Sequence, residues 1–205
     1  MKKEIYCGAR WILCNLLLCL VALISVVSIV SAESADTAAT EEKPGIEISF
    51  SYQSASTMAS NQIAVWVENE EGSAVKNLLV TDFTAGRRGY RNRDMALPAW
   101  VEAYDPETMT DEEIDALSSA TPGQGQLAYV WDFTNDLGEQ VPEGVYSVHV
   151  EGTLFWESDV LYTAKIDTAH LEDEITVEME RTAPDSHDNE NMITDVRVSA
   201  IGGGK

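Results

Sequence analysis

Four arginines are crowded into a short stretch of the chain and could together bind an anion. Arg87, Arg88, Arg91 and Arg93 share one stretch of sequence, and guanidinium groups bind phosphate through two parallel hydrogen bonds. The chain as a whole is acidic, with 35 Asp and Glu against 13 Lys and Arg. Two interpretations therefore stay open, a local anion-binding site and internal pairing of these arginines with carboxylates. The acidic excess favours pairing.

The loop Asp132–Gly138 contains several oxygen-bearing side chains of the kind that bind calcium. The EF-hand spacing is absent, because Leu137 stands where the sharp turn of that motif requires glycine. Asn135 and Asp136 are residues that hydrogen-bond their own backbone in turns, and Gly138 adopts positive φ without strain. We therefore predict a hydrogen-bonded turn and no metal site here.

The histidines are His149, His170 and His187, and none has a partner at the spacing of metal ligands. His149 alternates with Ser147 and Glu151 on the side of its strand that faces away from the predicted core, so we expect it to be solvated. No serine lies in the glycine-flanked turn of a hydrolase. The sequence favours a protein that is not an enzyme.

Residues 1–32 have the composition of a targeting segment. Basic residues precede an apolar run over residues 11–30, and a Val-Ser-Ala sequence ends at Ala32. The run is close to the length that spans a bilayer, so a retained membrane anchor is the alternative to a cleaved signal peptide. In both cases the rest of the chain is extracytoplasmic, either secreted or held at the outer face of the cytoplasmic membrane. All three cysteines lie in this segment, so the exported part has no disulfide.

The formal net charge of −22 bears on the partners of the exported part. Such a field repels nucleic acid and anionic lipid headgroups, so we expect neither as a partner. Residues 33–45 lack any aliphatic or aromatic residue larger than alanine and are predicted to form a disordered linker. Residues 46–201 are then the folded domain, and residues 202–205 a flexible glycine-rich tail.

Short segments of alternating apolar and polar residues indicate an all-β domain. The predicted strands cover residues 46–53, 63–67, 74–83, 127–133, 145–154, 174–181 and 192–200. Residues 154–156 and 160–166 are predicted to form a strand pair or one bulged strand. With turn signals between them, they favour an immunoglobulin-like β-sandwich with one short helical insertion. A small barrel is the alternative.

The stretch Tyr129–Glu151 is predicted to form a central β-hairpin, with Trp131 and Tyr146 as core residues on neighbouring strands. Before it, the β pattern breaks between Thr84 and Thr121. A capping box at Thr110–Glu113 predicts a short helix in this insertion, ending near Leu117.

Several short runs in this region resemble a family of predicted periplasmic or extracytoplasmic proteins that is known only as a domain of unknown function. The runs are Asp115–Pro122, Val130–Asp132, Asn135–Gly138, Val141–Tyr146 and Val150–Thr153. The hairpin portion is also similar to the immunoglobulin-like domain of flagellar hook-capping proteins. The resemblance implies an immunoglobulin-like sandwich without established enzymatic activity, found alongside FMN-binding and PepSY domains in systems that move electrons outside the cytoplasm.

The run Asp115–Thr121 also resembles the attachment sequence of FMN-binding domains, in which the last threonine is esterified with FMN phosphate. Asp115, Ser118, Ala120 and Thr121 match that pattern, whereas Ser119 stands in place of its glycine. The resemblance implies Thr121 as a flavin-attachment residue. The alternative is that the run is only the loop that leads from the predicted helix into the next strand.

From the sequence we expect an exported, non-enzymatic accessory or interaction module at the cell envelope without a bound cofactor of its own. The resemblance implies a partner such as a flavin-binding redox protein. Two other functions stay open, a covalent FMN-carrying redox protein with the flavin on Thr121, and a structural or adhesive surface domain.

Overall fold

The computed structural model describes residues 43–54, 61–86, 89–155, 158–171, 175–182 and 191–202. The predicted targeting segment, residues 33–42 of the predicted linker and residues 203–205 of the predicted tail lie outside the described residues, as do Arg87, Arg88 and His187. None of the helices in the described ranges is long and apolar enough to cross a membrane.

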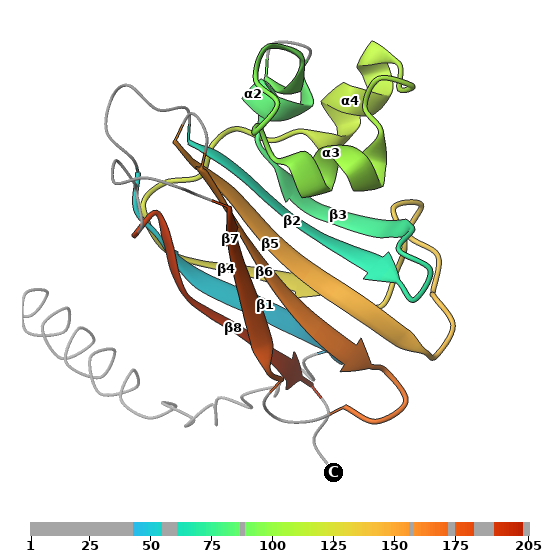
Figure 1. The fold of residues 1–205 in the computed structure, drawn as a ribbon. Coiled ribbons are helices and arrows are strands. Elements are labelled where there is room, and N and C mark those ends of the chain that lie inside the picture. Colours follow the sequence, from blue (N-terminus) through green and yellow to red (C-terminus); the bar gives the residue numbers. More distant parts are fainter. Residues whose placement is uncertain are drawn as a thin grey trace, which may run out of the picture. The chain divides into compact units, whose positions relative to one another are not determined.

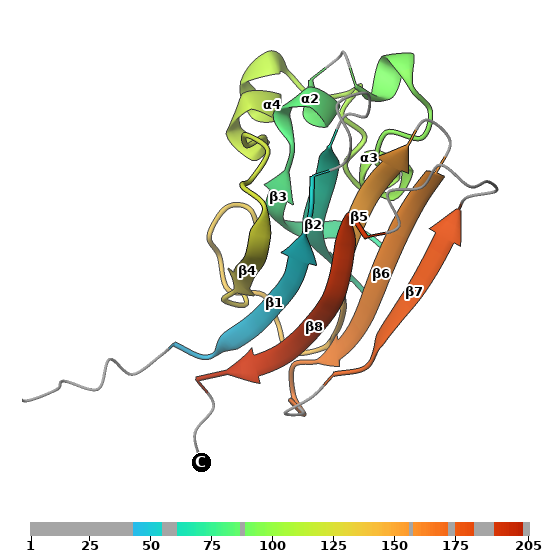
Figure 2. The same cartoon turned by 90° about the vertical axis from the view of Figure 1, so that its left-hand side faces the viewer.

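The described strands form two antiparallel sheets, which confirms the predicted all-β sandwich (Figures 1 and 2). Among the described residues the smaller sheet has three strands in the order β4-β1-β8 and the larger has five in the order β3-β2-β5-β6-β7. Their bounds are β1 Gly45–Tyr52, β2 Gln62–Asn69, β3 Ala74–Val80, β4 Gly125–Trp131, β5 Val145–Phe155, β6 Ser158–Asp167, β7 Val177–Thr182 and β8 Ile193–Ile201.

The main hydrophobic core lies between the two sheets and follows the predicted alternation. Ile46, Ile48 and Phe50 of β1 point into it and are fully buried. Gly152 of β5 faces β8 so closely that a Cβ there would lie 2.4 Å from Ile193 Cδ1. A side chain at this position would therefore displace the ends of the Ile193 and Met192 side chains, so glycine leaves room for them in the core.

The predicted hairpin between β4 and β5 is wrong. β4 pairs with β1, whereas β5 pairs with β2 and β6 in the other sheet. Trp131 and Tyr146 are both buried, as predicted, but they meet across the sandwich with ring centroids 5.0 Å apart. The connection over residues 132–144 is long enough to cross from one sheet to the other, and the predicted turn lies inside it, where Asn135 N donates to Glu139 O (2.8 Å).

The insertion between β3 and β4 contains more helix than predicted. It holds α2 (Asp82–Ala85), the 3-10 helix η1 (Tyr90–Asn92), α3 (Pro98–Tyr104) and α4 (Asp111–Leu117). The capping box of α4 is confirmed, because Glu113 N donates to Thr110 Oγ1 (3.2 Å) and Thr110 N donates to Glu113 Oε2 (2.8 Å). The three α-helices lie together beside β2 and β3 in both views (Figures 1 and 2).

These helices cover the outer face of the larger sheet over β2 and β3 and create a second hydrophobic core there, whereas β7 at the far edge stays exposed. Trp66 of β2 packs in this core with Leu97 and Trp100 from the insertion, and all three are fully buried. The outer face of β5 is therefore not a solvated surface. The expectation of a solvated His149 is wrong, since only 9% of this residue is exposed.

Candidate functional site

Two carboxyl groups are buried between the larger sheet and the helical insertion. Glu151 of β5 has no exposed surface, and Asp159 of the neighbouring strand β6 is 5% exposed. We call Glu151 and Asp159 the carboxyl pair. They share a hydrogen bond, and the guanidinium of Arg93 in the insertion is close enough to favour the charged form of Asp159.

Glu151 binds the first turn of α3. Ala99 N donates to Glu151 Oε1 (2.9 Å) and Trp100 N donates to Glu151 Oε2 (2.8 Å). The residue that precedes the helix, Leu97, has φ of 51° and no capping side chain, so the carboxylate of β5 supplies the cap from outside the helix. Thr153, two residues further along β5, accepts from Leu97 N (3.0 Å) and donates to Met95 O (2.9 Å).

The environment of the carboxyl pair raises both pKa values. Burial raises the pKa of Glu151 to about 7, although the two N–H groups of α3 oppose this shift. Burial, together with the negative charge of Glu151, raises the pKa of Asp159 to about 9, and Arg93 opposes it. The folded protein therefore holds a proton between the two carboxyl groups at neutral pH, which lets them lie together without adjacent negative charges.

Two of the four clustered arginines lie among the described residues, and each has acidic surroundings. Arg91 Nε lies 3.9 Å from Glu107 Oε1 at an exposed position, and its guanidinium is 5.8 Å from the centre of the Tyr90 ring. Burial lowers the pKa of half-buried Arg93, and the nearby charge of Asp159 raises it. This geometry agrees with internal pairing, and binding of an anion at the cluster stays a prediction.

His149 fills a position next to the carboxyl pair on the covered face of β5. Its ring stacks on Trp66 with centroids 4.7 Å apart, Nδ1 is 3.1 Å from Thr163 Oγ1, and Nε2 is 3.4 Å from Glu68 Oε2. Burial lowers its pKa, while Glu68 raises it. The ring is thus a packed, neutral component of the second core and has no open side for a substrate.

The residues that sequence reasoning missed are Glu151, Thr153 and Asp159. Strand β5 alternates polar residues on its outer face, a pattern that normally indicates solvent. A signal was present in β2, where Ala64 and Trp66 alternate with Ile63, Val65 and Val67, so that the strand is apolar on both faces. A strand of this kind is covered on both sides.

A second candidate region is an open groove at one end of the sandwich. The groove has a volume of about 560 Å³ and is formed by the β2–β3 turn, the start of β3, the β4–β5 connection and the start of β5. We call it the motif groove, because its lining includes most of the sequence Asn135–Tyr146 that carries the family resemblance. Neither member of the carboxyl pair lines it.

The turn at the rim of the motif groove is held firmly by hydrogen bonds. Asn135 Oδ1 accepts from Leu137 N (3.0 Å) and Glu139 N (2.9 Å), which is the side-chain turn predicted from the sequence. Asp136 fastens the turn to β3, since its N–H donates to Val75 O (3.0 Å) and its Oδ1 accepts from Asn77 N (2.8 Å). Gly138 has φ of 80°, the conformation for which glycine was expected here.

The absence of a calcium site at this turn stays a prediction. Two oxygens of the turn have protein partners, because Tyr104 Oη donates to Asp136 Oδ2 (3.2 Å) and Lys76 Nζ donates to Asn135 O (2.8 Å). Within the described ranges, no group of three or more His, Cys, Asp or Glu residues is arranged to hold a metal ion.

The four residues that match the FMN-attachment sequence lie at the end of α4 and in the loop that follows it. Asp115 is exposed on α4, Ser118 follows the last residue of that helix, and Ala120 and Thr121 are exposed in the loop. Ser119 is extended and bonded to the end of β3, with Ser119 N donating to Val80 O (2.8 Å) and Asp82 N donating to Ser119 O (2.8 Å). The run therefore ties the insertion to the sheet and leaves the hydroxyl-bearing residue Thr121 at the surface.

A family model matches most of the chain. Residues 45–182 match the model of a family described as predicted periplasmic protein, a domain of unknown function (DUF2271). No curated protein and no solved structure matches the chain significantly. The family description agrees with the extracytoplasmic location expected from the targeting segment.

The raised pKa values of the carboxyl pair predict that the free energy of unfolding falls as pH rises. Both groups have folded-state pKa values above their ordinary value of about 4, so the folded state binds more protons between about pH 4 and pH 9. For each such proton, the free energy of unfolding decreases by about 1.4 kcal/mol per pH unit. Asp159→Asn keeps a neutral group in place of the protonated acid, so we expect a flatter pH profile and a variant more stable than the natural protein at pH 8. Urea unfolding between pH 4 and pH 9 measures the free energy of unfolding of both proteins, with Glu180→Gln on exposed β7 as the control variant.

An Asp159→Asn profile as steep as that of the natural protein would contradict this account of the carboxyl pair.

Proposed function

The chain belongs to this family of predicted periplasmic proteins, and from this premise we propose that it is a non-enzymatic accessory module that binds another protein of the cell envelope. The proposed binding surface is the motif groove. If the apolar run of residues 11–30 is retained, it anchors the domain at the outer face of the cytoplasmic membrane.

The observation that carries this proposal is the presentation of Leu137. This side chain is 83% exposed at the tip of the turn that borders the motif groove. The side chains of Asn135 and Asp136 fix the turn by accepting backbone hydrogen bonds, so the exposed leucine does not have to be ordered when a partner binds. A preformed surface of this kind binds at a smaller cost in conformational entropy than a flexible loop.

The groups that could do acid–base chemistry support a binding function over an enzymatic one. Glu151, Asp159 and His149 lie under the helical insertion, and both carboxylate oxygens of Glu151 accept hydrogen bonds from the backbone of α3. A general acid or base must reach the substrate within hydrogen-bonding distance. Glu151 instead holds α3 on the sheet, Asp159 lies close to Arg93 of the insertion, and His149 stacks on Trp66 of the sheet.

The family resemblance suggests two relations to flavin, one through a partner protein and one through the domain itself. We propose a flavin-binding redox protein as the partner, in keeping with the family resemblance. The alternative is that the domain itself carries FMN on Thr121, and the exposure of this residue in a loop favours access by a transferase. A structural or adhesive role is the third candidate, for which the described residues provide no specific feature.

Site-specific crosslinking tests the proposed binding surface. A photoreactive amino acid replaces Leu137 in the protein produced in its own host, and the same replacement of exposed Glu112 on α4 is the control. We expect position 137 to yield a discrete adduct with one identified envelope protein, and the purified pair to lose affinity on Leu137→Ala. Equal adducts from both positions, or none from position 137, would contradict the proposal.

Intact-mass measurement tests the flavin-carrier alternative. The protein is coexpressed with a flavin transferase, next to an FMN-binding domain that the transferase labels. We expect the mass to stay unmodified, because Ser119 is extended and bonded to β3 where the attachment sequence has glycine. An FMN-sized increase that disappears in Thr121→Ala would make the protein a redox carrier instead.

A further inference from the structure

We propose that the motif groove accepts a cationic segment of the partner protein, in which a lysine or arginine lies next to an apolar residue. This inference rests on the proposed binding function and specifies the chemistry of the partner. It follows from the charges and the apolar surface that line the groove.

The lining of the motif groove carries negative charge and no positive charge. Glu70, Glu71, Asp136 and Glu143 line it, and no lysine, arginine or histidine does. Within the described part of the chain, no ion pair and no side-chain hydrogen bond engages the carboxylates of Glu70, Glu71 and Glu143. Three carboxylates on two different segments are thus available to one ligand.

Lys76 follows the groove-lining residue Val75 in β3, but its charged end is already bound. Lys76 does not line the groove, and its Nζ donates to Asn135 O (2.8 Å) and Thr134 Oγ1 (3.3 Å). The negative charge of Glu71 reaches the floor of the groove, where it adds to burial in raising the pKa of Tyr146. A cation that enters the groove would therefore meet an uncompensated negative potential.

The same groove offers apolar surface between its carboxylates. Val75, Val141 and Val145 line it with Leu137, and Val145 is 39% exposed. Lysine and arginine place their methylene stems on apolar surface while their charged ends reach carboxylates at the rim. A segment that alternates basic and apolar residues matches both features.

Other occupants fit the groove less well. A second copy of this chain also carries a formal net charge of −22, so two acidic surfaces would repel each other. A divalent cation would need several convergent oxygens, whereas both oxygens of Asp136 already accept hydrogen bonds from Asn77 and Tyr104. A basic protein segment is the occupant that the charge and shape of the groove favour.

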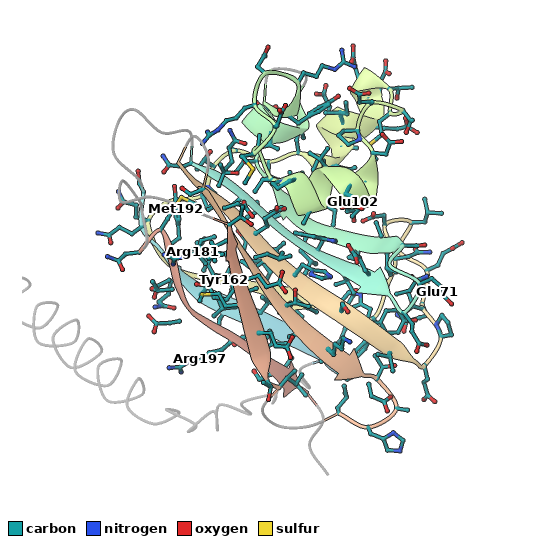
Figure 3. All side chains as sticks on the ribbon, viewed as in Figure 1. Glu71, Glu102, Tyr162, Arg181, Met192 and Arg197 are labelled. Atoms are coloured by element: carbon teal, nitrogen blue, oxygen red, sulfur yellow. The ribbon has the colours of Figure 1, made fainter. Side chains whose placement is uncertain are left out.

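Binding of defined peptides tests this inference on the purified full chain. The probe is a blocked, fluorescent peptide of alternating lysine and leucine, and its control has glutamine in place of lysine. The groove variant is Glu70→Gln/Glu71→Gln/Glu143→Gln, in which all three substituted side chains are exposed. The control variant, Glu102→Gln/Glu112→Gln/Glu180→Gln, removes the same charge from α3, α4 and β7. Figure 3 shows Glu102 on α3 and Glu71 at the β2–β3 turn.

We expect the lysine peptide to bind at low salt, to weaken at least about tenfold in the groove variant and to change little in the control variant. High salt should weaken it too, because exposed charge pairs are screened. Circular dichroism of both variants checks that they stay folded.

Four results would overturn the inference. Equal weakening in both variants would indicate attraction to the overall charge, and equal binding of the glutamine peptide would indicate purely apolar recognition. Displacement of the peptide by calcium alone would indicate a metal site. Absence of any peptide binding also overturns it, and in that case an adduct from position 137 would still support the proposed binding function, so the two failures are distinguishable.

Discussion

The carboxylate of Glu151 binds two backbone N–H groups of α3, and the arrangement of the covered face depends on this contact. Helix α3 has only seven residues and no capping side chain of its own, so it has little stability without a partner. The contact fixes the position of Trp100, which fills the second core against Trp66. Placing a carboxylate there requires that a second buried acid, Asp159, keep its proton and that Arg93 stand close by.

The motif groove is connected to the same layer through side chains. Tyr104, at the end of α3, donates to Asp136 in the turn that borders the groove (3.2 Å). Trp100 Nε1 donates to Asn77 Oδ1 (3.1 Å), and Asn77 N donates to Asp136 Oδ1 (2.8 Å). The helical insertion thus supports the turn that presents Leu137. In this loop Asp136 is hydrogen-bonded to β3 and α3, whereas the neighbouring Leu137 is exposed. Loops held by a rigid scaffold commonly present binding residues in this way.

Much of the fold was predictable because strands, helix caps and turns depend on residues that are close together in the sequence. The alternation of β1, the capping box of α4 and the turn at Asn135 are all present in the structure. The pairing of β4 was not predictable, because alternation determines which face of a strand is buried and leaves its neighbour open. Glu151, Thr153 and Asp159 were missed, and His149 was wrongly expected to be solvated, because a polar outer face of a strand is typical of a solvated surface unless an insertion distant in sequence covers it. The groove depends in the same way on segments that only the fold brings together.

Amide hydrogen exchange of α3 is the most direct test of the central claim that Glu151 holds the insertion on the sheet. Glu151→Gln keeps the size of the side chain but removes its charge and one of its two acceptors. The account predicts that the N–H groups of Ala99 and Trp100 exchange about tenfold faster in this variant, while amides of the β1–β4 pairing keep their protection. Unchanged protection of α3 in a folded Glu151→Gln protein would contradict the account.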